Sequence, residues 1–232
     1  MKKILITGAN RGIGLELVKQ LVDAGEFVFA GCRNPENAMQ LQDLANIHVD
    51  RVAVVALDVT NDASVAAAKT AVAAQTDHLD IIINNAGILV PNETVANFDP
   101  GEMDKTFQVN VIGPMRIISQ FVDLLQRGNE PKLVNVSSQL GSLEKMQTMN
   151  WGDYSYNASK AALNMLTRKL SHELSNIVVI TLHPGWVQTD MGGKSAAITI
   201  PDSARGIIEV IRNLRPQDTN KFYTYAGVEH PW

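Results

Sequence analysis

Short apolar segments alternate with longer segments of mixed polarity along nearly the whole chain. Most of the apolar segments are continuous rather than alternating, which is typical of parallel strands in a sheet that is covered on both faces. We predict strands at Ile4–Thr7, Phe27–Cys32, Val52–Leu57, Leu79–Asn84, Leu133–Ser137, Ile177–Leu182 and Phe222–Tyr225.

The segments between these strands have helical patterns. We predict helices at Ile13–Ala24, Asp62–Gln75, Asp104–Arg127, Tyr154–Leu174 and Pro201–Asn213. Asn34 followed by Pro35 resembles an N-cap with proline at the first helical position, so a short helix is expected after the second strand. This alternation predicts right-handed βαβ units. The expected fold is α/β, a single doubly wound Rossmann-type domain over residues 1–232 with a mostly parallel seven-stranded sheet.

Composition narrows the class of protein. A chain of 232 residues with 45% hydrophobic and 19% charged residues is ordinary for a globular domain, and its net charge of −4 argues against a nucleic-acid partner. The lone Cys32 suits a reducing compartment. No segment approaches the roughly 18 apolar residues of a membrane span, and the run Ile4–Ile6 after two lysines is too short for a signal peptide. We expect a cytoplasmic protein without a membrane partner.

A glycine-rich turn follows the first strand and opens the first helix. It reads Thr7-Gly8-Ala9-Asn10-Arg11-Gly12-Ile13-Gly14. Glycines in this position let the backbone approach a pyrophosphate, whose charge then lies at the positive end of a helix. A plain tight turn is the alternative, but the position between strand and helix favours a dinucleotide.

The charged residues near the second strand predict which dinucleotide the site binds. A site for NAD usually has a carboxylate at the end of that strand, whereas here the strand ends Gly31-Cys32-Arg33. Arg11 and Arg33 are suited to a 2′-phosphate because guanidinium groups bind phosphate through two parallel hydrogen bonds. We therefore predict NADP(H), the alternative being that both arginines are merely solvated.

Tyr156 and Lys160 lie four residues apart on a predicted helix, so both side chains can point into one cleft. Reduction of a carbonyl needs a proton donor, and a nearby ammonium lowers the pKa of a phenol from its usual value of about 10. Taken alone, such a pair is more often a pair of neighbours on a helix surface. The combination of motifs changes that balance.

The sequence resembles the short-chain dehydrogenase/reductase family over essentially its full length. The matching elements are the glycine turn, Asp58, Asn84-Asn85-Ala86-Gly87, Ser137-Ser138 with Tyr156 and Lys160, and Pro184-Gly185 with Thr189. Asn110 fits the fourth catalytic position of the family. The glycine turn and the residues near Trp232 are most similar to the sniffer-like and C-factor-like carbonyl reductases.

The resemblance implies a role for each matching residue. Tyr156 would be the general acid, Lys160 would lower its pKa and hold the nicotinamide ribose, Ser138 would polarise the substrate carbonyl, and Asn110 would hold a water. The cofactor-binding residues implied are Gly8, Asn10, Arg11, Gly12, Ile13, Gly14, Arg33, Asp58, Val59, Asn85, Ala86, Gly87, Tyr156, Lys160, Pro184, Gly185, Val187 and Thr189. The implied activity is NADP(H)-dependent reduction of a small aldehyde or ketone, without a metal.

Several positions have a structural alternative. Asp58 and Thr60 can cap the next helix, Asn84–Gly87 can be a strand-ending turn, and Asn110 can satisfy a backbone kinked by Gly113-Pro114. Ser137 can replace Ser138, although the second serine is favoured. His183 is expected to be a strand-end residue rather than a proton relay. The segment from Gln139 to Ser155, with Met146, Met149 and Trp151, is either an apolar wall of the cleft or a surface loop, and Met191–Ile200 is short for a lid.

The sequence also leads to expectations about the oligomeric state and about an alternative function. The helices Asp104–Arg127 and Tyr154–Leu174 carry apolar residues on more than one face, among them Ile117, Ile118, Leu163 and Leu166. The resemblance implies that such helices pair between subunits, so we expect a homodimer or homotetramer. The alternative to an enzyme is an NADP(H)-binding regulatory or signalling protein with incidental turnover. The intact Ser138, Tyr156 and Lys160 favour the enzyme.

Overall fold

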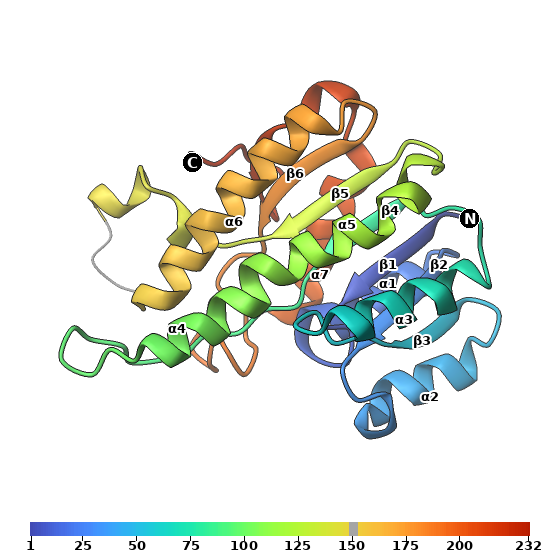
Figure 1. Cartoon of the computed structure of the whole chain (residues 1–232), viewed down its shortest axis with the longest axis horizontal. Coiled ribbons are helices and arrows are strands. Elements are labelled where there is room, and N and C mark those ends of the chain that lie inside the picture. The colour runs from blue at the N-terminus through green and yellow to red at the C-terminus, as the bar shows by residue number, and fades with distance from the viewer. Residues whose placement is uncertain (149–152) are drawn as a thin grey trace.

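The computed structural model describes residues 1–148 and 153–232, and a single sheet of seven strands forms its centre (Figure 1). The strands are β1 Lys3–Thr7, β2 Phe27–Cys32, β3 Val52–Ala56, β4 Ile81–Asn84, β5 Lys132–Val136, β6 Val178–His183 and β7 Lys221–Thr224. Their order is β3-β2-β1-β4-β5-β6-β7, and every pairing is parallel. The predicted α/β fold is confirmed, and the sheet is parallel throughout. The strand order reverses between β1 and β4, where ligands bind in doubly wound sheets.

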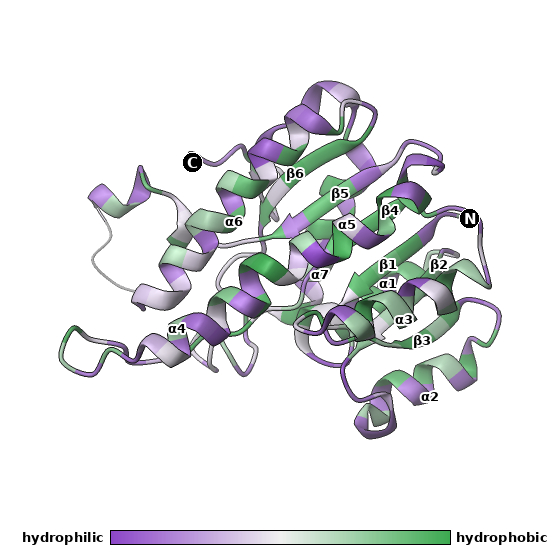
Figure 2. Cartoon of the chain, viewed as in Figure 1, coloured by the Kyte–Doolittle hydropathy of each residue, from purple (hydrophilic) through white to green (hydrophobic). Residues whose placement is uncertain are grey.

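Helices cover both faces of this sheet. They are α1 Gly12–Asp23, α2 Met39–Ile47, α3 Asp62–Ala73, α4 Pro100–Phe107, α5 Gly113–Gln126, α6 Tyr154–Glu173 and α7 Ile200–Asn213. Helices α1, α2 and α7 pack on one face with Ile4 and Ile6, and α3, α5 and α6 pack on the other with Leu5. Strands buried on both faces explain the continuous apolar runs in the sequence, which Figure 2 shows as a hydrophobic centre.

The helix predicted over Asp104–Arg127 is wrong in its start and its continuity. Helix α4 begins at Pro100, because the Asp99 carboxylate accepts a hydrogen bond from the Gly101 backbone and proline suits the first turn. A π-helical turn, Gln108–Ile112, then separates α4 from α5. Pro114 has no N–H to donate to the Asn110 carbonyl, which is one reason the regular helical ladder is interrupted here.

The short helix expected after the second strand is present, but it begins differently. A 3₁₀ turn at Pro35–Asn37 precedes α2, and the side chain of Asn34 makes no cap bond to it. Proline rather than the asparagine side chain therefore starts this segment. No helix among residues 1–148 and 153–232 is long and apolar enough to cross a membrane.

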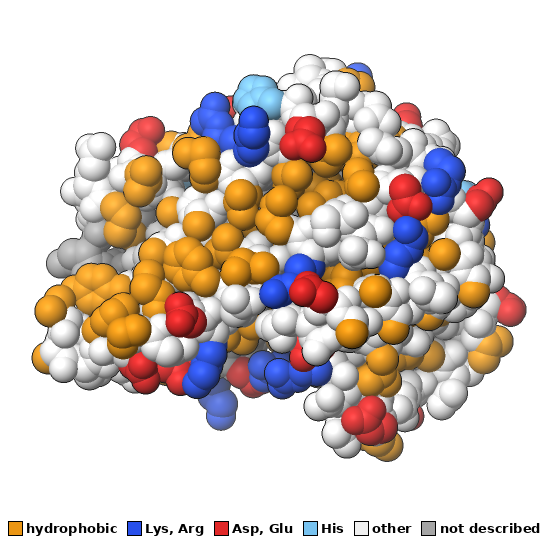
Figure 3. Space-filling view, in the orientation of Figure 1, with side chains coloured by type: hydrophobic (Ala, Val, Ile, Leu, Met, Phe, Trp, Pro, Cys, Tyr) orange, Lys and Arg blue, Asp and Glu red, His pale blue; other side chains and the backbone are white. Residues whose placement is uncertain are grey.

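The apolar residues singled out on the two long helices mostly belong to the core of the monomer. Ile117, Ile118 and Leu163 are buried, and Leu166 is half-buried. The expectation that Ile117, Ile118 and Leu163 lie in a subunit interface is therefore wrong, because these side chains are in the core. Hydrophobic side chains still gather on the face that carries α4, α5 and α6 (Figure 3). On α6, Met165 is 67% exposed.

Candidate active site

The glycine turn holds its shape through two residues with positive φ. Gly8 has φ +65° and Gly12 has φ +55°, a region that side chains rarely adopt. A Cβ on Gly14 would lie 2.2 Å from the Gly8 carbonyl oxygen, so only glycine fits there. Helix α1 starts at Gly12, and Arg11 makes no side-chain bond to its free N–H groups. The turn thus offers the free N–H groups at the start of α1 to an anion, which fits a pyrophosphate.

The two predicted arginines differ in their surroundings. Arg11 donates a hydrogen bond of 2.7 Å to the Asp190 carboxylate, and both side chains are largely exposed. Arg33 is exposed directly after β2. Arg11 is thus already paired with a carboxylate, so Arg33 is the better placed of the two to bind a phosphate.

Asp58 organises the turn that precedes α3. Its carboxylate accepts hydrogen bonds from the backbone and hydroxyl of Thr60, while Asn61 caps the helix by accepting from Ser64. The idea that Asp58 or Thr60 caps this helix is therefore wrong. Val59 is buried and lies against Gly113, where a Cβ would come within 3.0 Å of it.

The segment after β4 joins the glycine turn to the centre of the site. The Asn85 side chain donates to the carbonyls of Thr7 and Gly8, and the Thr7 hydroxyl accepts from the Asn85 and Ala86 backbone. A Cβ on Gly8 would lie 2.9 Å from the Ala86 Cα. This segment is thus a strand-ending turn and also the wall against which the glycine turn packs. Thr7, the first residue of the glycine-turn motif, thus joins the two segments through its hydroxyl.

Asn110 is fully buried in the π-helical turn. Its side-chain amide pairs with both the N–H and the C=O of Ile88 and also donates to the Ser159 hydroxyl at 3.0 Å. Both amide hydrogens of Asn110 are therefore used within the protein. The side chain thus fastens the segment after β4 to α6.

Tyr156 and Lys160 lie one turn apart on α6, and both are buried. The Lys160 Nζ lies 5.5 Å from the centre of the Tyr156 ring and donates to the Val136 carbonyl at 2.9 Å. A Cβ on Gly87 would be 3.7 Å from this Nζ. The segment Ala86-Gly87 thus connects the glycine turn to Lys160.

Burial sets the protonation of this pair. It raises the pKa of Tyr156 to about 12, opposed by the side-chain hydrogen bond with Ser138. It lowers the pKa of Lys160 to about 8. In the protein without cofactor, burial thus raises the phenol pKa instead of the expected lowering. Tyr156 is a neutral phenol at neutral pH, which is the form that donates a proton.

The two serines after β5 have different surroundings. Ser137 points inward, where its hydroxyl donates to the Asn164 side chain at 2.7 Å. Ser138 lies close enough to Tyr156 to oppose the rise of the Tyr156 pKa, and its oxygen accepts a hydrogen bond from the Leu140 backbone. The structure thus brings the second serine, rather than the first, next to Tyr156.

The segment after β6 is held by close packing. Gly185 has φ +88°, and a Cβ there would lie 2.2 Å from the Ile198 side chain. Val187 pairs with Ile198, while the Ser203 hydroxyl donates to the Pro184 carbonyl at 2.7 Å. Thr189 reaches toward Gly12, where a Cβ would be 3.5 Å from its methyl group. This segment therefore faces the glycine turn from the side of α7.

His183 ends β6 with its ring buried beside that of His230, as expected for a strand-end residue. Burial lowers the pKa of His183 to about 4, so it is neutral at neutral pH.

The C-terminal tail contributes a contact that the sequence did not reveal. The Trp232 carbonyl accepts hydrogen bonds from the Ser142 hydroxyl and the Glu144 backbone, a few residues after Ser138 in the chain.

Met149 and Trp151, considered above for an apolar wall of the cleft, lie outside the described residues. Met146 is half-buried and lies in a short 3₁₀ turn, Lys145–Gln147.

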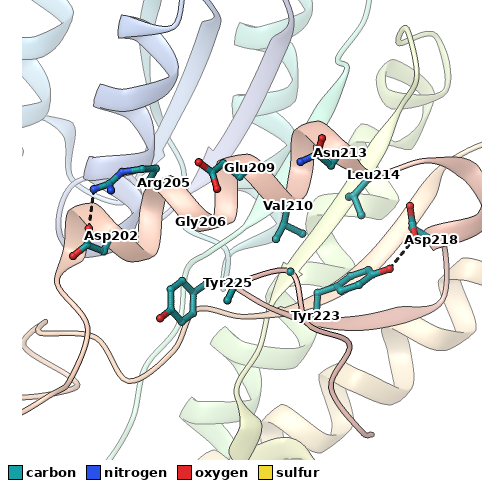
Figure 4. Close-up of a pocket in the computed structure, with 12 residues that line it drawn as sticks. Asp202, Arg205, Gly206, Glu209, Val210, Asn213, Leu214, Asp218, Tyr223 and Tyr225 are labelled. Atoms are coloured by element: carbon teal, nitrogen blue, oxygen red, sulfur yellow. Dashed lines mark hydrogen bonds and ion pairs between the residues drawn. The ribbon is translucent and has the colours of Figure 1, made fainter.

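A groove of about 650 Å³ lies elsewhere, between α7 and β7 (Figure 4). None of the predicted site residues lines it. Four of its polar side chains pair with one another, since Arg205 donates to Asp202 and the Tyr223 hydroxyl donates to Asp218. We therefore place the candidate active site at the ends of β1, β4, β5 and β6, not in this groove.

Comparisons with known proteins identify the family of this chain. The family model described as short chain dehydrogenase matches residues 2–198. The C-signal protein of Myxococcus xanthus is 41% identical over 159 residues, which cover 68% of this chain and 95% of that protein.

Two solved structures are similar over the whole chain. The NADPH-bound carbonyl reductase from chicken fatty liver is 36% identical with a TM-score of 0.94, and the match covers 100% of this chain and 99% of that one. The carbonyl reductase Sniffer of D. melanogaster is 34% identical with a TM-score of 0.95 and full coverage of both chains. On the fold, the family match and these relatives, the chain belongs to the short-chain dehydrogenase family.

Proposed function

We propose that this protein is an NADP(H)-dependent reductase of a small aldehyde or ketone. The observation that carries the proposal is the grouping of Ser138, Tyr156 and Lys160 beside Gly87, at the end of a wall that continues from the glycine turn. Two structurally similar proteins are named as carbonyl reductases, one of them bound to NADPH. Together these observations support the reaction and the cofactor.

The cofactor would lie across the carboxyl ends of the strands. The N–H groups at the start of α1 would bind its pyrophosphate, in a turn whose shape depends on Gly8, Gly12 and Gly14. Arg33 would bind the 2′-phosphate, with Arg11 assisting if it exchanges Asp190 for the phosphate. The remaining contacts would come from Asn10, Ile13, Asp58, Val59, Asn85, Ala86, Gly87, Lys160, Pro184, Gly185, Val187 and Thr189.

The bound nicotinamide supplies a hydride to the carbonyl carbon, and the protein supplies the proton. Tyr156 donates its phenolic proton to the carbonyl oxygen as that oxygen becomes an alkoxide. The buried phenol is protonated before the reaction because its pKa is about 12. The phenolate left behind forms next to the Lys160 ammonium, which stabilises it.

The neighbouring residues prepare this transfer. Ser138 would donate a hydrogen bond to the carbonyl oxygen, an interaction that strengthens as charge develops there. Lys160 is fixed by the Val136 carbonyl and keeps two further N–H groups for the nicotinamide ribose. Asn110 holds Ile88 and Ser159 in place and would also hold a water near Lys160.

The experiment is a substrate screen. Oxidation of NADPH is followed at 340 nm (roughly the absorbance maximum of the reduced nicotinamide) with aldehydes, quinones, diketones and keto-esters, and NADH is tested in parallel. Turnover of one of these classes with NADPH is the expected result. NADPH binding without turnover of any class contradicts the proposal.

A second candidate is a regulatory protein that binds NADP(H) and reduces a carbonyl compound only incidentally. The observation that favours it is the 41% identity to a protein named C-signal. Such a protein would melt at a higher temperature with NADPH but reduce no carbonyl. The presence of Ser138, Tyr156 and Lys160 in one cluster makes the enzyme the better supported of the two.

A further inference from the structure

The Glu93 side chain lies at the start of α6, although it comes from the segment between β4 and α4. One of its carboxylate oxygens accepts a hydrogen bond of 2.7 Å from the Ser155 backbone, and the other accepts from the Ser155 hydroxyl. In return, the Glu93 backbone donates to the Asp153 carboxylate at 2.7 Å. Two segments about 60 residues apart are thus joined by three reciprocal hydrogen bonds.

Glu93 replaces a cap that α6 does not provide for itself. Asp153 precedes the helix, but its side chain makes no cap bond to it. The first N–H groups of a helix need acceptors from outside, and a negative charge at this end is also favoured by the helix dipole. Ser155 is fully buried, so water does not replace Glu93 there.

The cap lies next to the proposed proton donor. Tyr156 follows Ser155 directly and stands in the first turn of α6, where helices are most prone to fray. Lys160 lies one turn deeper and is fixed independently by the Val136 carbonyl. Loss of the cap should therefore displace Tyr156 more than Lys160.

We infer that Glu93 is a positioning residue, which fixes the Tyr156 phenol against Ser138 by capping the first turn of α6. The inference rests on the proposed function, because it gives Tyr156 a catalytic task. Glu93 acts through Ser155 and need not touch substrate or cofactor. Geometry of this kind is sensitive, since a displacement of about 1 Å can lower a rate roughly 100-fold.

The test compares Glu93→Ala with Glu93→Gln. The alanine variant removes both acceptors, so kcat should fall at least tenfold while the Kd for NADPH stays within about twofold of the wild type. The glutamine variant keeps both contacts, because its amide oxygen accepts from the Ser155 backbone and its NH₂ donates to the Ser155 hydroxyl. It should restore most of kcat. Glu102→Ala is the matched control, since Glu102 pairs with Lys105 on α4 and should leave kcat unchanged.

Hydrogen exchange gives a second measurement that does not depend on turnover. Amides at residues 154–157 should exchange faster in Glu93→Ala than in the wild type or in Glu93→Gln. Unchanged exchange and unchanged kcat in the alanine variant overturn the inference. An equal loss of kcat in Glu93→Gln and Glu93→Ala also overturns the inference, because the effect would then come from the carboxylate charge and not from the position of Tyr156. If Tyr156→Phe keeps full turnover, the proposed function fails instead, and exchange alone then decides whether Glu93 holds this turn.

Discussion

Lys160 carries a positive charge in a buried position where that charge is costly. Burial lowers its pKa to about 8, so the ammonium form is complete only below that pH. Stabilisation of the Tyr156 phenolate and contact with the ribose both need this charge. The proposed reaction should therefore slow as pH rises through about 8.

This pH dependence can be assigned to one residue. The kcat/KM for carbonyl reduction should be level below pH 8 and fall above it. In Lys160→Arg, which stays charged to pH 12 or higher (roughly the guanidinium limit), activity should be lower but the fall at pH 8 should disappear. A fall at the same pH in the arginine variant would assign the titration to another group.

Arg33 is expected to set the cofactor preference. Replacement by aspartate removes a charge-assisted bond of about 1.5–3 kcal/mol to a 2′-phosphate and adds repulsion. The Kd for NADPH, measured by fluorescence titration, should rise tenfold or more, whereas the Kd for NADH should be unchanged or lower. Arg212→Asp is the control, because Arg212 lies near Ile4 and Ile81 at the opposite end of the strands. Equal affinity of the wild type for both cofactors contradicts the prediction.

Among the helices and strands, those that follow from a local hydrophobic pattern were predictable from the sequence. The strands follow from continuous apolar runs, and helix α6 follows from a long periodic segment. The π-helical turn at Gln108–Ile112 was not predictable in the same way, because it depends on Pro114 and on the long-range contacts of Asn110.

In the candidate site, too, some residues were predictable from local sequence and others were not. Tyr156, Lys160 and the glycine turn are recognisable because their spacing is local. The capping role of Glu93 and the contact of Trp232 with Ser142 join residues far apart in sequence. Glutamate and tryptophan at these positions carry no local pattern, so only the fold reveals them.

The junction of β1 and α1 gives a direct prediction about an element. In Gly14→Ala, the new Cβ would lie 2.2 Å from the Gly8 carbonyl oxygen and 2.6 Å from the Asn85 amide. The turn would have to open, so stability should fall by about 1–3 kcal/mol and the Kd for NADPH should rise about 100-fold. Thermal melting with and without NADPH measures both effects.

Gly101→Ala is the matched control for this prediction. A Cβ there meets only the Asp99 carboxylate, at 3.2 Å. It should preserve NADPH binding. A Gly14→Ala variant that binds NADPH like the wild type would show that the turn does not cradle the cofactor.

For the whole molecule, the exposed apolar face over α4, α5 and α6 predicts self-association (Figure 3). Met165 on α6 is 67% exposed. Light scattering at micromolar concentration should give at least twice the chain mass of 25.3 kDa. Met165→Lys should lower this mass toward the monomer because it places a charge in the interface.

Met39→Lys provides the control for that measurement. Met39 is 63% exposed on α2, which packs on the other face of the sheet. This variant should keep the mass of the wild type. A wild-type mass near 25.3 kDa would contradict the prediction of a homodimer or homotetramer.

The central claim is that Tyr156 delivers the proton, and Tyr156→Phe tests it most directly. This variant removes one buried oxygen and leaves the glycine turn and Lys160 in place. With a substrate found in the screen and with NADPH saturating, carbonyl reduction should fall roughly 10²–10⁴-fold. The Kd for NADPH should stay within about twofold, which separates catalysis from binding. Turnover near that of the wild type would contradict the account and favour a regulatory role.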